Sequence, residues 1–342
     1  MSELKATDFP TTLEEKQAML DQVLADQLPQ YSPQEHPKLS YIVGQPASGK
    51  TSTIESLKFQ APGVEIDSDT LRALHPRMGE IFRADPLRMD VLSNEPVGFL
   101  FSNLLQEYKS HHFNIYLENT MTNTAAIRST VEDFSSDGYL VEVHLIATPA
   151  PVSRLAIATR YFGQLHAADD SDIDSNYPRW TSVFAHDNAF NKIPEAIRRL
   201  DGIPDVLQVW ENGVVVYKGQ DVNQATDILT KLRDKPLSAE VRELYSAKFA
   251  AIQREFRALA NNNAPVHKLY ESVILDAKKL GISFSDSPVS SNKNEFRNRA
   301  ALTDFLPPLT AQALKHQARS SKDDCAPANH HRTLQRKPRR IL

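Results

Sequence analysis

Residues 38–51 read KLSYIVGQPASGKT, and this stretch decides the fold of the chain. Its first part, Lys38–Val43, is apolar enough for a short buried strand, and its second part, Gly44–Thr51, fits the pattern G-x-x-x-x-G-K-[ST] in full. The two glycines let the backbone curl so that its N–H groups point at phosphate oxygens, and the positive end of a following helix adds to the attraction. We therefore predict a phosphate-binding loop between a strand and a helix over Thr51–Phe59.

The loop predicts binding of ATP and Mg²⁺. Lys50 is expected to lie across the β- and γ-phosphates, and the hydroxyl of Thr51 is expected to hold the metal. An ordinary glycine turn is the alternative, but the apolar strand before the loop and the helix after it favour a nucleotide site. The full set of predicted nucleotide-binding residues is Gly44, Gln45, Pro46, Ala47, Ser48, Gly49, Lys50, Thr51 and Ser52.

Strands and helices alternate after the loop, which predicts a mainly parallel sheet covered on both faces. Further strands are expected at Val64–Asp67, Phe113–Glu118 and Tyr139–Ala147, and helices at Leu87–Lys109, Asn123–Asp137 and Pro151–Leu165. Asn212-Gly213 between two apolar runs is a strong hairpin signal. The fold class is therefore α/β, a three-layer fold of the phosphate-loop kinase type with a C-terminal helical extension.

Four segments are expected along the chain. Residues 1–37 carry an N-terminal helix that packs on the core, residues 38–219 form the kinase-type domain, and residues 220–282 form a helical extension of two amphipathic helices. Residues 283–342 are polar and finally basic, and a partly disordered tail is expected there.

Composition limits the classes of function. The 342 residues carry a net charge of −4 and a single cysteine, Cys325, which favours a reducing, cytoplasmic location. The sequence shows neither an apolar stretch of membrane-spanning length nor a signal peptide. The core is not expected to bind nucleic acid; for the basic tail, a solvated extension and a nucleic-acid or membrane contact both stay open.

Two carboxylates follow the second expected strand, in Ile66-Asp67-Ser68-Asp69. Ligands bind at the carboxyl edge of an open parallel sheet, so a carboxylate there can orient an acceptor hydroxyl toward a γ-phosphorus. Asp67 and Asp69 would point the same way if the strand continued, but an Asp here can equally cap the next helix. Glu118 and Thr120 end the third strand at the same edge, where substrate contact, Mg²⁺ binding and simple solvation all remain possible.

Two arginines flank a polar, acidic stretch at residues 167–178 that is expected to form a lid. Arg160 lies in the helix before it and Arg179 directly after it. Guanidinium groups match the charge that spreads over a transferring phosphoryl group. Pairing with surface carboxylates is the alternative for both arginines.

From about Thr12 to Lys218, the chain resembles the zeta toxins, the kinase half of bacterial toxin–antitoxin pairs. Several motifs carry the resemblance in order: the loop G-Q-P-x-x-G-K-T, Ile66–Pro76 (IDSDTLRALHP), Tyr116–Thr120 (YLENT), Arg160-Tyr161, and Arg179 seven residues before His186-Asp187. The chain departs from the family at Asn119, where Gly is common, and at Thr122, where Arg is common.

The resemblance implies phosphorylation of the 3′-hydroxyl of UDP-N-acetylglucosamine, which stops cell-wall synthesis. It implies four catalytic residues, Asp69, Lys50, Arg160 and Arg179, and five substrate-binding residues, Asp67, Arg72, His75, Glu118 and Thr120. Asp69 would be the base that orients the sugar hydroxyl. The resemblance also implies a partner antitoxin whose helix blocks the nucleotide site.

Two alternatives stay open. The same chemistry could act on another acceptor, such as a nicotinamide dinucleotide, an antibiotic or a nucleic-acid end. The chain could also be a nucleotide-binding module without catalysis that presents its C-terminal helices to a partner.

Overall fold

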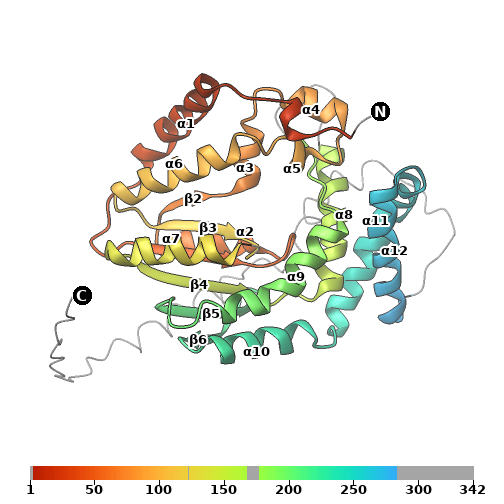
Figure 1. Ribbon diagram of the computed structural model, residues 1–342. Helices are drawn as coiled ribbons and strands as arrows, with labels where there is room; N and C mark the ends of the chain where they lie inside the picture. Colours follow the sequence, from red (N-terminus) through yellow and green to blue (C-terminus); the bar gives the residue numbers. More distant parts are fainter. Residues whose placement is uncertain (1–2, 122, 168–176, 283–342) are drawn as a thin grey trace, which may run out of the picture. The chain divides into compact units, whose positions relative to one another are not determined.

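The central feature of the fold is one six-stranded sheet. The computed structural model describes residues 3–121, 123–167 and 177–282 (Figure 1). The strand order is β2-β3-β1-β4-β5-β6, with every neighbouring pair parallel except β5 and β6. The strands are β1 (Lys38–Val43), β2 (Val64–Ile66), β3 (Ile115–Asn119), β4 (Leu140–Ile146), β5 (Val206–Glu211) and β6 (Val214–Gly219). The predicted α/β class with a mainly parallel sheet is confirmed.

The strand order fixes where ligands can reach the sheet. β1 lies between β3 and β4, so the chain leaves β1 toward one side and returns to its other side through β4. Such a reversal opens a crevice at the carboxyl ends of the central strands. The loop after β1 and the last residues of β3 both lie at that edge.

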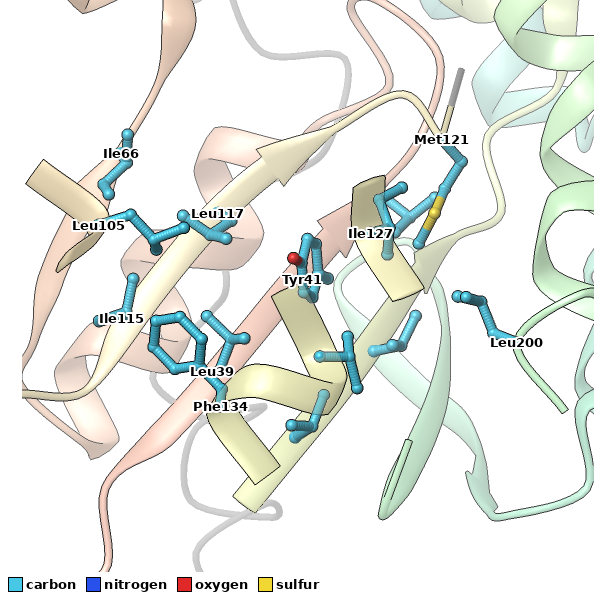
Figure 2. Close-up of a cluster of buried hydrophobic side chains, with 14 of the residues drawn as sticks. Leu39, Tyr41, Ile66, Leu105, Ile115, Leu117, Met121, Ile127, Phe134 and Leu200 are labelled. Atoms are coloured by element: carbon cyan, nitrogen blue, oxygen red, sulfur yellow. The ribbon is translucent and has the colours of Figure 1, made fainter. Parts of the chain in front are cut away.

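The two faces of the sheet are covered unequally. The larger core joins one face to α1 (Leu13–Gln27), α6 (Val97–Ser110), α7 (Thr124–Ser136), α9 (Val183–Arg198) and α10 (Val222–Arg233). Figure 2 shows part of it, where Leu39, Tyr41 and Leu117 of the sheet meet Ile127 and Phe134 of α7. On the other face, Ile54 of α2 (Lys50–Gln60) packs in a smaller cluster with Ile42, Tyr116, Ile146 and Trp210.

Local chemistry explains most element limits. Thr12 caps α1, with Glu15 completing a capping box, and Asn123 caps α7 through its side chain. Asn212 and Gly213 both adopt positive φ, at 51° and 77°, and form the predicted turn between β5 and β6.

The structure corrects the predicted limits around the second strand and the long helix. The strand ends at Ile66, one residue early, and α3 (Ser68–Ala73) begins directly after Asp67. The expected helix over Leu87–Lys109 is broken into α5 (Met89–Leu92) and α6. Pro96, at the start of α6, lacks the N–H that a continuous helix would need there.

The expected helical pair is present after α10. α11 (Ala239–Asn262) and α12 (Ala264–Lys279) contact each other, and both contact α8 (Ala150–Ala167). They share with α8 a separate hydrophobic cluster rich in aromatic rings. α10 instead packs against α9 and β5 as part of the main core, so residues 220–282 do not share one core. Nothing in the described parts of the chain forms a helix with the length and apolar character of a membrane span.

Phe256 is the centre of this second cluster and offers a direct test of it. Its ring is fully buried and contacts the rings of Phe162, Trp180 and Tyr270. We expect Phe256→Ala to lower the free energy of unfolding by about 3–5 kcal/mol, measured by urea denaturation. Phe59→Ala is the control, since Phe59 is 78% exposed, and it should change little. Equal losses in the two variants would contradict the packing described here.

Candidate active site

The loop after β1 has the curled backbone that its glycines predict. Ala47 and Gly49 adopt positive φ, at 57° and 93°, and α2 begins at Lys50. The hydroxyl of Thr148 donates to the carbonyl of Ser48 at 2.7 Å, which ties the loop to the segment after β4. Positive φ is readily adopted by glycine and is uncommon for alanine, so the surroundings hold this conformation.

Gly44 is required for space rather than for its φ. A Cβ at this position would collide with the side chain of Ser48, which is itself buried, and would press on Ile146. We expect Gly44→Ala to distort the loop at a cost of about 1–3 kcal/mol and to weaken ADP binding by roughly tenfold, measured by calorimetry. Gly98→Ala is the control, because an added Cβ on this exposed helical residue meets nothing. Unchanged binding in Gly44→Ala would contradict the predicted role of the loop.

Lys50, Thr51 and Glu118 come together beside the loop. Nζ of Lys50 donates to the Gln45 carbonyl at 3.2 Å and lies 3.9 Å from a carboxylate oxygen of Glu118. The Thr51 hydroxyl donates to the other oxygen of Glu118 at 3.0 Å. A hydroxyl and a carboxylate are oxygen donors of the kind that Mg²⁺ takes together with phosphates, so this pair fits the predicted metal. Thr51 and Glu118 are the residues that could hold it.

Asp69 is held between two arginines. It lies in the first turn of α3, and its carboxylate accepts from Arg72 at 2.7 Å and from Arg179 at 2.9 Å. Burial alone would raise the pKa of this carboxyl, but the charges of Arg179 and Arg72 hold the pKa below its usual value. Asp69 is therefore a carboxylate that stays ionised, suited to accept a hydrogen bond more than to retain a proton.

Arg160 stands next to this group on α8. One of its terminal nitrogens donates to the Thr181 hydroxyl at 3.2 Å, while its Nε has no hydrogen-bond partner among the described residues. Burial and the nearby charge of Arg179 both lower the pKa of the Arg160 guanidinium. Two cations held close together in a partly dry site favour an anion between them.

One cavity of about 830 Å³ brings ten of the predicted residues together, while the predicted loop residues Gly44, Gln45, Ser48, Gly49, Thr51 and Ser52 are outside its described wall. Its volume lies in the range of ligand-binding pockets. The predicted residues in its wall are Pro46, Ala47, Lys50, Asp67, Asp69, Arg72, Glu118, Thr120, Arg160 and Arg179. Arg179 thus pairs with a carboxylate inside the cavity instead of with a surface carboxylate.

Two predicted substrate-binding residues have structural partners. Asp67 caps α3, and its carboxylate accepts from the backbone N–H groups of Asp69 and Thr70 at 3.2 and 2.9 Å. Asp67 is therefore the cap of α3, and strand alternation does not apply to Asp67 and Asp69 because β2 has already ended at Ile66. His75 is 2% exposed, its ring nitrogens lie 3.1 Å from the Phe9 carbonyl and the Arg77 N–H, and it is absent from the described part of the cavity wall. His75 thus has partners within the fold and lies away from the described cavity wall, and its contact with substrate stays a prediction.

Other predictions fall outside the described residues. These are most of the expected lid, at 168–176, Thr122, and the tail at 283–342.

A buried polar network behind the loop was not predicted. The ring of His186 bridges the Ser153 hydroxyl at 2.8 Å and the Asp187 carboxylate at 2.7 Å. Burial lowers the pKa of His186, although the bond to Asp187 opposes this. Arg154 then joins Asp187, at 3.0 Å, to Asp276 of α12, at 2.8 Å. The sequence held a signal for part of this network, since His186-Asp187 belongs to the motifs of the resemblance, but no signal for Asp276.

Comparison with protein families finds a match that covers more than half of the chain. A family model described as zeta toxin matches residues 21–221, which include the loop, Asp69 and both arginines. The chain belongs to the zeta toxin family. This is a family of kinase-like toxins, and the chain is a kinase-like toxin of that kind.

One curated protein and one solved structure, both from the same species, are similar to this chain. Toxin PezT of Streptococcus pneumoniae serotype 4 is 26% identical over 195 residues, which cover 55% of this chain and 75% of the relative. A solved structure from the PezAT chromosomal toxin–antitoxin system of the same species matches with a TM-score of 0.59 at 21% identity. That match covers 72% of this zeta toxin and 97% of the solved chain, and it shows a shared fold.

Proposed function

We propose that this zeta toxin transfers the γ-phosphoryl group of ATP to the 3′-hydroxyl of UDP-N-acetylglucosamine. The observation that carries the proposal is the convergence of Lys50, Asp69, Arg160 and Arg179 on one cavity. Phosphoryl transfer has a loose transition state, so a site needs placement and positive charge more than covalent chemistry. A phosphate loop, a carboxylate and two arginines around one space supply both.

Each residue has a proposed part in the reaction. The loop and Lys50 bind the β- and γ-phosphates, and Thr51 and Glu118 would hold Mg²⁺, which when bound neutralises phosphate charge. Asp69 accepts a hydrogen bond from the acceptor hydroxyl and aims its oxygen at the γ-phosphorus. Arg160 and Arg179 stabilise the charge on the transferring group.

The proposed transfer is a single displacement at the γ-phosphorus, in which one bond forms and one breaks. The acceptor oxygen forms a bond to the γ-phosphorus while the bond from that phosphorus to the bridging oxygen breaks. ADP leaves with the electron pair of that bond, and the hydroxyl proton passes by way of Asp69 to water. Because Asp69 is paired with Arg72 and Arg179, it can receive this proton only briefly. Its main contribution is then alignment.

The choice of UDP-N-acetylglucosamine as the acceptor is supported by the family and by the size of the cavity. Pockets for drug-sized ligands occupy roughly 300–1,000 Å³, so a cavity of about 830 Å³ accommodates a bulky acceptor next to the phosphates. The test is incubation of the protein with γ-labelled ATP, Mg²⁺ and UDP-N-acetylglucosamine, with the phosphorylated position assigned by NMR. Label on the 3′-oxygen supports the proposal. Label only on a nicotinamide dinucleotide, an antibiotic or a nucleic-acid end, when these are offered, would replace the acceptor.

We also propose an antitoxin partner that restrains this activity, acting with the toxin in the cytoplasm, where ATP is present. The solved relative comes from a toxin–antitoxin system, which supports such a partner. For the domains, we propose the kinase domain with residues 1–37 packed on it, followed by a helical extension and a tail from 283. The packing of α10 on the main core supports ending the kinase domain after Arg233 instead of at 219.

A further inference from the structure

Arg233 is a buried cation placed behind the phosphate loop. It ends α10, beyond the segment that the family model matches, and it is only 5% exposed. One terminal nitrogen donates to the side-chain oxygen of Gln45 at 2.5 Å, and the other donates to the carbonyl of Phe190 at 3.1 Å. The guanidinium also lies over the Phe190 ring, 4.3 Å from its centre.

The position of Arg233 is costly for the fold. Its contacts within the described chain are a neutral amide, a backbone carbonyl and an aromatic ring, with no ion pair to a carboxylate, and its Nε has no hydrogen-bond partner there. Burial lowers the pKa of Arg233 to about 10, although the charge of Asp234 opposes this. Burying a charge without an ion pair costs stability, so the stability of the fold alone does not explain this arginine.

The side chain that Arg233 holds belongs to the loop itself. Gln45 is fully buried, and its amide nitrogen donates to the Thr148 carbonyl at 2.8 Å and to the Ser153 hydroxyl at 3.0 Å. With Arg233 on its oxygen, every end of the Gln45 amide is fixed. The backbone carbonyl of the same residue accepts from Lys50 at 3.2 Å. A shift of Gln45 would therefore move a contact of the lysine expected to bind phosphate.

We propose that Arg233 is a positioning residue for the phosphate loop, which it holds through Gln45 in the shape that binds the β- and γ-phosphates. Its charge also adds to the positive potential behind the loop. Arg233 does not line the described cavity, so it acts through Gln45 and not by contact with substrate. This inference rests on the proposed function in one respect, the binding of nucleotide at the loop.

The test compares Arg233→Met and Arg233→Lys with the wild type in the full chain. Mg·ADP binding is measured by calorimetry well below the unfolding temperature, and KM for ATP and kcat are measured with the acceptor. We expect Arg233→Met to weaken ADP binding by roughly tenfold, the effect of losing a charged hydrogen bond, with kcat at saturating ATP changed far less. Arg233→Lys keeps the charge and should recover part of the affinity. Arg198→Met, which removes an exposed ion pair with Asp227, is the control.

A merely structural role gives a different result. Arg233→Met would then lower the unfolding temperature but bind Mg·ADP as the wild type does, and this would overturn the inference. If Arg233→Met does not fold, the same comparison is made with Arg233→Lys: binding of Mg·ADP equal to that of the wild type would overturn the inference. The effects of Arg233→Met and Gln45→Ala should also overlap in the double variant, because both act on one contact, and full additivity would count against the proposal. Failure of the wild type itself to bind Mg·ADP would instead refute the proposed function, and the positioning role of Arg233 would fall with it.

Discussion

Asp69→Asn is expected to slow phosphoryl transfer by about 10²–10⁴-fold while Mg·ADP still binds. Asn keeps the size of the side chain but removes the charge that Arg72 and Arg179 contact and weakens the acceptor for the substrate hydroxyl. The rate is measured in single turnover with saturating ATP, and binding by calorimetry. Lys50 and the loop are untouched, so nucleotide affinity should stay within a few-fold of the wild type.

Asp227→Asn is the matched control for this variant. Asp227 is also a helical carboxylate paired with an arginine, Arg198, but it lies on the exposed face of α10. Its loss should leave the rate unchanged. If Asp69→Asn transfers phosphoryl groups at the wild-type rate, the proposed mechanism is wrong. If Asp69→Asn loses transfer but stays as toxic to cells as the wild type, the result favours a nucleotide-binding module without catalysis.

The pH dependence of the rate follows from the same contacts. The folded-state pKa of Asp69 lies below its usual value of 3.8, so the carboxylate form contributes stability above that pH. This contribution is lost only as the pH falls through the lowered value. An acid limb in the rate near neutral pH would therefore belong to another group, such as the phosphates of the nucleotide.

Lys50→Met is expected to weaken nucleotide binding and to reduce transfer by on the order of 10²-fold or more, since a charged contact to the phosphates is lost. Lys50 is 8% exposed, and its Nζ is directed by the Gln45 carbonyl and by Glu118. Met preserves the length and the apolar stem, which limits the effect on folding. Binding is measured with Mg·ADP and the rate with the acceptor.

Lys58→Met is the control on the same helix. Lys58 lies further along α2 and pairs with Glu65 at 3.4 Å, outside the described cavity wall. Its removal should leave both binding and rate near the wild type. If Lys50→Met bound and turned over nucleotide as well as Lys58→Met, Gly44–Thr51 would be an ordinary glycine turn and not a phosphate-binding loop.

The sequence predicted the sheet well because its strands are short apolar runs between strong breakers. β1 was predicted to the residue, and the hairpin at Asn212-Gly213 followed from the φ values that those residues allow. α9 and α10 were missed. α9 contains Pro194 and several polar residues, which weaken its helical pattern. α10 has apolar residues at helical spacing, Val222, Ala225 and Leu229, after the capping residue Asp221, so its sequence does carry a helix signal.

The sequence predicts the parts of the site that lie in contiguous motifs. It does not predict the parts that depend on contacts between residues far apart in the chain. The loop motif is contiguous, and the sequence motifs predict Asp69, Arg160 and Arg179 as site residues, which the structure places in one cavity wall. Asp67 and His75 belong to one motif but differ in burial, since Asp67 lines the described cavity and His75 is 2% exposed, and the motif alone does not predict this difference. Arg233 lies 188 positions from Gln45, and nothing in the sequence near either residue predicts the contact.

The most direct test of the account is mass spectrometry of a cell metabolite extract after incubation with ATP, Mg²⁺ and either the wild type or Asp69→Asn. We expect a metabolite that gains one phosphoryl group with the wild type only, together with an equal amount of ADP. ADP formed without any phosphorylated metabolite, or the same product from both proteins, would contradict it.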